Sequence, residues 1–146
     1  MPTAFEKRLA TLAHAQFDKY RWLRENQEPL AGQIKAYWID LGLAIPNVAQ
    51  PWSGLFVSWC IKQAGATGAQ FMFSPQDSQF VNAAIANAKA HATAVPEVGV
   101  DNKGNYLRTI GGNESDSVGM KEVRLDADGM VKNPAGLYIS VIESML

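Results

Sequence analysis

A serine lies at the start of an apolar helical segment in this sequence. In the run Pro51-Trp52-Ser53-Gly54, the proline opens the segment and the hydroxyl of Ser53 falls in its first turn. The first N–H groups of a helix have no acceptor within it, and the helix dipole favours negative charge there. Such a position can bind the oxyanion formed when a hydroxyl attacks a carbonyl, and Gly54 lets a substrate approach the backbone. The alternative is that Ser53 only caps the helix.

Few other side chains could support nucleophilic or metal chemistry, because the chain has one cysteine and two histidines. Cys60 lies two helical turns, about 10 Å of rise, beyond Ser53 in the same apolar segment, so we expect a buried structural thiol. One cysteine excludes an internal disulfide, and so few cysteines and histidines argue against a metal site. We expect no metal and no other cofactor.

His91 and Asp77 each have a purely structural interpretation. His91 follows the strongly helical run 83–90, and a solvated histidine in the last turn of a helix interacts favourably with the dipole. Asp77 lies three residues after Ser74 and is explained most simply as part of a helix cap.

The N-terminal two-thirds of the chain predict helices. Thr3 and Glu6 form a capping box, Pro29 and Pro51 can each open a helix, and glycines supply the stops. Apolar residues at helical spacing then predict helices over residues 5–20, 30–41, 52–64 and 80–88.

After about residue 91 the pattern changes to short β-rich runs separated by turn signals. We expect strands at 93–98, 106–110, 118–125 and 137–142, with turns at 101–104, 111–113, 128–129 and 133–134. Such short connections suit an antiparallel sheet. The predicted class is therefore α+β, with residues 1–146 as one domain: a helical part over about 1–90 packed on a sheet over about 91–146.

Composition narrows the function by exclusion. The 146 residues are 47% hydrophobic and 18% charged, as in a globular domain, and their net charge is −1. That balance provides no basic stripe for a nucleic-acid partner. No apolar stretch approaches the roughly 18 residues of a membrane span, and no signal-peptide pattern follows Met1. We expect synthesis in the cytoplasm and, for any external target, export by a specialised secretion route.

The run Pro51-Trp52-Ser53-x-x-Phe-Val-Ser-Trp-Cys60 resembles the nucleophile helix of papain-like peptidoglycan hydrolases, the CHAP and NlpC-type amidases and endopeptidases. Their motif reads Pro-Trp-Cys-x-x-Phe-Val. The chain is more similar still to a bacterial branch with Ser in place of that Cys. This branch continues with a capped helix, here 73–81, with Ile-Gly-Gly-Asn, here 110–113, and with a following Ser-Val, here 117–118. The matched blocks therefore lie within residues 51–118.

The resemblance implies a papain-like fold and three catalytic roles. Ser53 takes the nucleophile position, His91 opens a strand of the form His-x-x-x-Val-x-x-Val, and Asn113 falls where a polar residue orients the histidine. It also implies substrate contacts for Trp52, beside the nucleophile, and for Gly54 and Asp77. The family's Pro-x-x-Gly-Asp strand motif is absent ahead of the histidine, and Pro96 interrupts the histidine strand.

The resemblance therefore implies an amide hydrolase, an amidase or endopeptidase, acting on peptidoglycan or its peptide stem. A phage lysin, or an antibacterial effector sent to a periplasmic target and held in check by a cognate inhibitor protein, fits the absence of a signal peptide. The serine itself leaves three interpretations open: a serine enzyme, a degenerate site, or a replaced cysteine. The alternative function is a catalytically degenerate domain that serves as a binding or inhibitory module.

Overall fold

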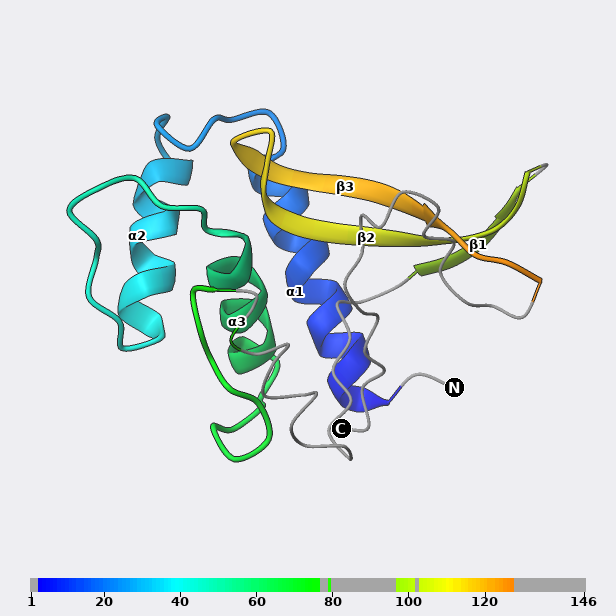
Figure 1. Cartoon of the computed structure of the whole chain (residues 1–146), viewed down its shortest axis with the longest axis horizontal. Coiled ribbons are helices and arrows are strands. Elements are labelled where there is room, and N and C mark those ends of the chain that lie inside the picture. The colour runs from blue at the N-terminus through cyan, green and yellow to red at the C-terminus, as the bar shows by residue number, and fades with distance from the viewer. Residues whose placement is uncertain (1–2, 77–78, 80–96, 102, 128–146) are drawn as a thin grey trace.

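The computed structural model describes residues 3–76, 79, 97–101 and 103–127. Its helices are α1 (Ala4–Tyr20), α2 (Leu30–Asp40) and α3 (Ser53–Gln63), and its strands are β1 (Glu97–Asp101), β2 (Gly104–Glu114) and β3 (Ser117–Arg124). The three helices pack on an antiparallel sheet of order β1-β2-β3, and α3 lies between α1 and α2 (Figure 1). The α+β class predicted from the sequence is confirmed.

Local signals set the ends of the helices as predicted. Thr3 Oγ1 accepts a hydrogen bond from the Glu6 N–H at 3.1 Å, and the Glu6 carboxylate accepts one from the Thr3 N–H, which completes the capping box. Pro29 stands at the N-cap of α2, one residue ahead of its first turn. Gly42 and Gly65 follow α2 and α3 with φ of 73° and 107°, the left-handed conformation that ends many helices.

The sheet corrects one predicted turn. The pairing of Asp101 with Gly104 confirms the turn between β1 and β2, but residues 111–113 form part of β2. The chain instead reverses at Ser115 and Asp116, whose φ angles of 54° and 61° suit a type I′ hairpin. The predicted helix 80–88, the strand 137–142 and the turns at 128–129 and 133–134 lie outside the described residues, as does the predicted strand 93–98 up to residue 96.

The core is centred on α3, as its apolar sequence predicts. Tyr37 of α2 packs its ring against Phe56 and Trp59 of α3, with centroid separations of 5.9 and 4.9 Å. Its hydroxyl donates a hydrogen bond to Gln16 Oε1 of α1 at 2.6 Å. Seven of the eleven residues of α3 are buried: Gly54, Leu55, Phe56, Ser58, Trp59, Cys60 and Ile61.

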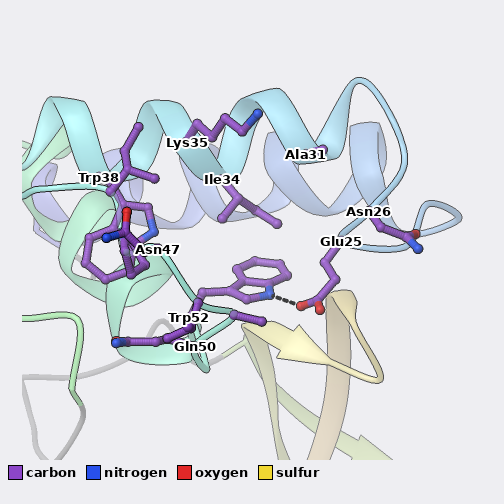
Figure 2. Close-up of a pocket in the computed structure, with 13 residues that line it drawn as sticks. Glu25, Asn26, Ala31, Ile34, Lys35, Trp38, Asn47, Gln50 and Trp52 are labelled. Carbon is purple, nitrogen blue, oxygen red and sulfur yellow. Dashed lines mark hydrogen bonds between the residues drawn. The ribbon is translucent and has the colours of Figure 1, made fainter.

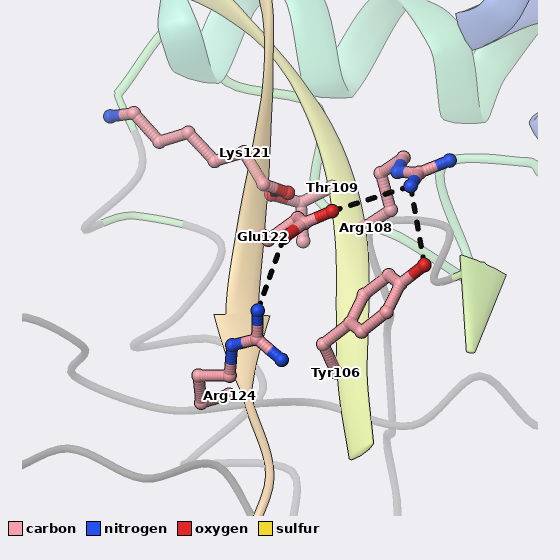
Figure 3. Close-up of polar contacts among 6 residues, drawn as sticks. All are labelled: Tyr106, Arg108, Thr109, Lys121, Glu122 and Arg124. Carbon is pink, nitrogen blue, oxygen red and sulfur yellow. Dashed lines mark hydrogen bonds and ion pairs between the residues drawn. The ribbon is translucent and has the colours of Figure 1, made fainter. Parts of the chain in front are cut away.

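Polar side chains pair across β2 and β3 where these strands reach away from the helices. Arg108 lies opposite Glu122 and bonds its Oε1 at 3.3 Å, while Arg124 bonds Oε2 of the same carboxylate at 3.4 Å (Figure 3). Both guanidinium groups also lie over the ring of Tyr106. Pairs at this level of exposure are worth about 0–1 kcal/mol each, so they favour this strand register more than they stabilise the fold.

Candidate functional site

Ser53 is the first residue of α3, and Trp52 occupies the N-cap position. The Phe56 N–H donates to the Trp52 carbonyl at 3.0 Å, so the N–H groups of Gly54 and Leu55 precede the first intrahelical bond. Since Ser53 lies within the helix, the capping interpretation does not describe it. The half-buried serine and these first-turn N–H groups share one helix end, as a nucleophile and its oxyanion donors must.

Trp52 joins this helix end to the rest of the molecule. Its side chain is buried, with 2% of its surface exposed, and its indole stacks against Tyr37 of α2 at a centroid distance of 6.4 Å. The indole N–H donates to Glu25 Oε2 at 2.9 Å (Figure 2). The tryptophan beside Ser53 is therefore a core residue whose orientation is set by both packing and a hydrogen bond.

Strand β2 crosses the same end of α3 in close contact. A Cβ added to Gly112 would lie 2.7 Å from Trp52 Cζ3 and 2.5 Å from Phe56 Cβ, so only glycine fits here. Asn113 is the next residue, about 3.8 Å further along the Cα trace, and adopts a left-handed φ of 60° at a bulge in the strand. Asn113 therefore directly follows the residue of β2 that contacts this end of α3.

Of the remaining predicted site residues, one lies in the described part of the chain and two lie outside it. Gly54 is buried in the first turn of α3. His91 and Asp77 lie outside the described residues, so their roles stay predictions.

The cap signature that includes Asp77 does begin as predicted at Ser74. Its hydroxyl accepts a hydrogen bond from the Gln76 N–H at 3.0 Å and donates to Gln79 Oε1 at 2.7 Å. The Ser58 hydroxyl in turn donates to the Ser74 carbonyl at 2.7 Å and accepts from its N–H at 2.9 Å. Ser58, the second serine in the run 51–60, is therefore structural, because it holds this capped turn against α3.

Sequence reasoning missed Glu25. Its carboxylate holds the Trp52 indole, and its N–H donates to the Asp116 carbonyl at 2.7 Å. One residue of the connection between α1 and α2 therefore binds both the start of α3 and the turn between β2 and β3. Glu25 and Trp52 are 27 positions apart, and no periodic pattern in the sequence indicates that they pair.

A groove of about 300 Å³ opens beside Trp52. It lies between α2 and the connection to α3, and Figure 2 shows Ile34 pointing from α2 toward the Trp52 indole. Apolar and polar side chains share its walls. The polar ones are Glu25, Asn26, Lys35, Asn47 and Gln50.

Cys60 is a buried free thiol, as expected from its segment. Burial raises its pKa to about 12, so the thiol stays protonated and unreactive at neutral pH. Within the described part of the chain, no group of three or more His, Cys, Asp or Glu side chains could hold a metal ion. None of the helices in that part is long and apolar enough to cross a membrane.

Comparison with known proteins places the chain in one family. No curated protein and no solved structure matches it. The family model that does match is described as "Uncharacterized protein conserved in bacteria (DUF2272)" and covers residues 10–105. The matched stretch contains Ser53, Asp77 and His91, and it ends before Asn113. Because the match covers well over half of the 146 residues, the chain belongs to the bacterial DUF2272 family.

Proposed function

We propose that this chain is a papain-like amidase or endopeptidase that hydrolyses an amide bond of peptidoglycan, with Ser53 as its nucleophile. The position of Ser53 as the first residue of α3 supports the proposal, because the first-turn N–H groups of Gly54 and Leu55 precede the first intrahelical hydrogen bond. The resemblance of residues 51–60 to the nucleophile helix of such hydrolases supports the same assignment.

The proposed reaction follows the logic of a catalytic triad. His91 takes the proton of the Ser53 hydroxyl as its oxygen attacks the amide carbonyl, and the first-turn N–H groups of α3 bind the oxyanion. His91 then gives the proton to the leaving amine, which leaves an acyl-serine that water hydrolyses. Asn113 orients the imidazole. A serine needs this base at every turnover because its hydroxyl is un-ionised at neutral pH.

The test is digestion of purified sacculi by the full chain and by Ser53→Ala. The wild-type chain should release soluble fragments, and Ser53→Ala should release none while keeping the wild-type melting temperature. Ser115→Gly is a matched control, because it removes an exposed hydroxyl at a turn residue with positive φ and should leave digestion unchanged. Undiminished digestion by Ser53→Ala would disprove the assignment. Binding to sacculi without any release, equal in both chains, would instead support a binding or inhibitory module.

A further inference from the structure

Trp22 is the most exposed large apolar side chain in the described part of the chain. It lies two residues after the end of α1, and its exposed fraction is 83%. The other three tryptophans, Trp38, Trp52 and Trp59, are buried. An indole is among the side chains that gain most from burial, and tryptophan is enriched at the energetic centres of protein interfaces. Trp22 therefore marks an interaction surface.

A positive charge accompanies this indole. The Arg21 guanidinium lies over the Trp22 ring, 5.1 Å from its centroid, and over the Phe17 ring at 5.2 Å. Such cation–π contacts favour a position of the guanidinium beside the rings. Arg21 forms no ion pair with any of the described residues. The connection after α1 thus presents an apolar ring together with a charge that no carboxylate in this part of the chain neutralises.

The groove beside Trp52 has apolar walls that suit such a side chain. Ile34 and Trp38 line it from α2, and Ile45 and Val48 line it from the connection to α3. Its volume of about 300 Å³ lies at the lower end of the range for small-ligand sites. The groove therefore suits one large side chain better than a whole helix.

Glu25 gives the groove a negative charge. Its half-buried carboxylate accepts the Trp52 N–H through Oε2, and it forms no ion pair with any cation among the described residues. Lys35 is the other charged residue of the lining, and Figure 2 shows its side chain directed away from Glu25 and Trp52. A guanidinium that entered with an indole could form a charge-assisted hydrogen bond with Glu25.

The exposed indole and the groove lie near each other in one chain. Trp22 and Glu25 are three positions apart, so their Cα atoms are at most about 11 Å from each other. Trp22 does not line the groove of its own chain. A two-fold interface uses the same patch on both copies, so each copy can offer its indole and its groove at once. The net charge of −1 adds little repulsion between copies.

We propose that the chain forms a two-fold dimer in which Trp22 of each copy occupies the partner's groove and Arg21 pairs with the partner's Glu25. Trp52 lines the groove and directly precedes Ser53, so the second copy lies beside the start of α3. Dimer formation requires no turnover and does not depend on the proposed function.

Sedimentation equilibrium of the full chain, between about 1 μM and 1 mM, should show a dimer. Trp22→Ala and Val48→Lys should each raise the dissociation constant about a hundredfold or more, because both indole contacts of the dimer are lost. Glu25→Gln can still accept the Trp52 N–H and should raise the constant about tenfold, since only the charge is removed. Met72→Ala truncates another exposed apolar side chain outside the groove lining and should dimerise as the wild type does.

A mixture of two variants tests whether the contacts are reciprocal. Trp22→Ala mixed with Val48→Lys should dimerise more tightly than either variant alone, because one contact of the mixed dimer is intact. Such rescue would also show that both variants fold.

Tryptophan fluorescence gives a second measurement. Since the other three tryptophans are already buried, the emission of the wild-type chain should shift to shorter wavelength as concentration rises, and that of Trp22→Ala should not. A wild-type monomer at about 1 mM would overturn the proposal. A dimer that Trp22→Ala leaves unchanged, or a mixture no tighter than its components, would do the same, as would oligomers that grow beyond two copies.

Discussion

Gly112 of β2 lies directly against the indole of Trp52, the residue that precedes α3. Any side chain at position 112 would overlap Trp52 Cζ3 and Phe56 Cβ. The contact joins the sheet to the helix end that carries Ser53. The N–H of the same indole donates to the Glu25 carboxylate. Three separate stretches of chain, around Glu25, Trp52 and Gly112, therefore meet at this indole.

Gly112→Ala should lower the free energy of unfolding by about 1–3 kcal/mol, because the added methyl must displace packed atoms. In an active chain it should also lower kcat, since Asn113 moves with its neighbour. Gly68→Ala is the matched control, because nothing lies within 4 Å of the added Cβ and its φ is not in the left-handed range. Urea unfolding measures the difference, and equal stabilities for the two variants would contradict the close contact.

Ser58→Ala should also lower the free energy of unfolding by about 1–3 kcal/mol. The substitution leaves the N–H and carbonyl of Ser74 without their partner in a buried position. Thr11→Ala removes an exposed hydroxyl that bonds the Lys7 carbonyl on α1, and it should change stability by less than about 0.5 kcal/mol. Thermal or urea unfolding compares the two variants. If Ser58→Ala lowered the free energy of unfolding as little as Thr11→Ala does, the hydrogen bonds between Ser58 and Ser74 would not stabilise the fold.

Cys60 should make the fold less stable in alkaline solution. Burial raises its pKa from 9.0 to about 12, so below pH 9 the thiol is protonated in both states and has no pH-dependent effect. Between pH 9 and 12 the unfolded chain loses this proton first, and the free energy of unfolding falls by about 1.4 kcal/mol per pH unit.

The measurement is urea unfolding at pH 8, 9, 9.5 and 10 for the wild-type chain and for Cys60→Ala. Burial also raises the pKa of Tyr37 above its ordinary value of 10.0, so the tyrosine adds its own loss only from about pH 10 upward. The slope between pH 9 and 10 therefore isolates the thiol. Identical slopes for the two chains would show that the thiol ionises equally in both states.

Ser53→Cys should retain hydrolysis of sacculi and become sensitive to iodoacetamide, because a thiolate at a helix N-terminus is a strong nucleophile. The buried Cys60, whose pKa is raised, should stay unmodified in the folded chain, so mass spectrometry of the variant should find a single alkyl group, at position 53. The wild-type chain treated in the same way is the control. Alkylation that left the digestion rate unchanged would remove position 53 from the catalytic site.

Helix ends could be predicted because their signals are local. Thr3 and Glu6 satisfy each other across one turn, and Gly42 and Gly65 adopt positive φ two residues after α2 and α3 end. Residues 111–113 show the limit of such signals. Gly-Gly-Asn predicts a turn as well as it predicts a bulged strand, and only the packing of Trp52 and Phe56 against Gly112 explains why a glycine stands inside β2.

The sequence by itself determined that a serine begins a buried helix, because Pro51 and the apolar run after it are sufficient to predict both. The tertiary structure alone decided what surrounds that serine. Glu25, Trp52 and Gly112 are far apart along the chain, and their contact depends on how α2, α3 and the sheet pack together. No local period encodes such packing, since it results from burying the apolar faces of several elements at once.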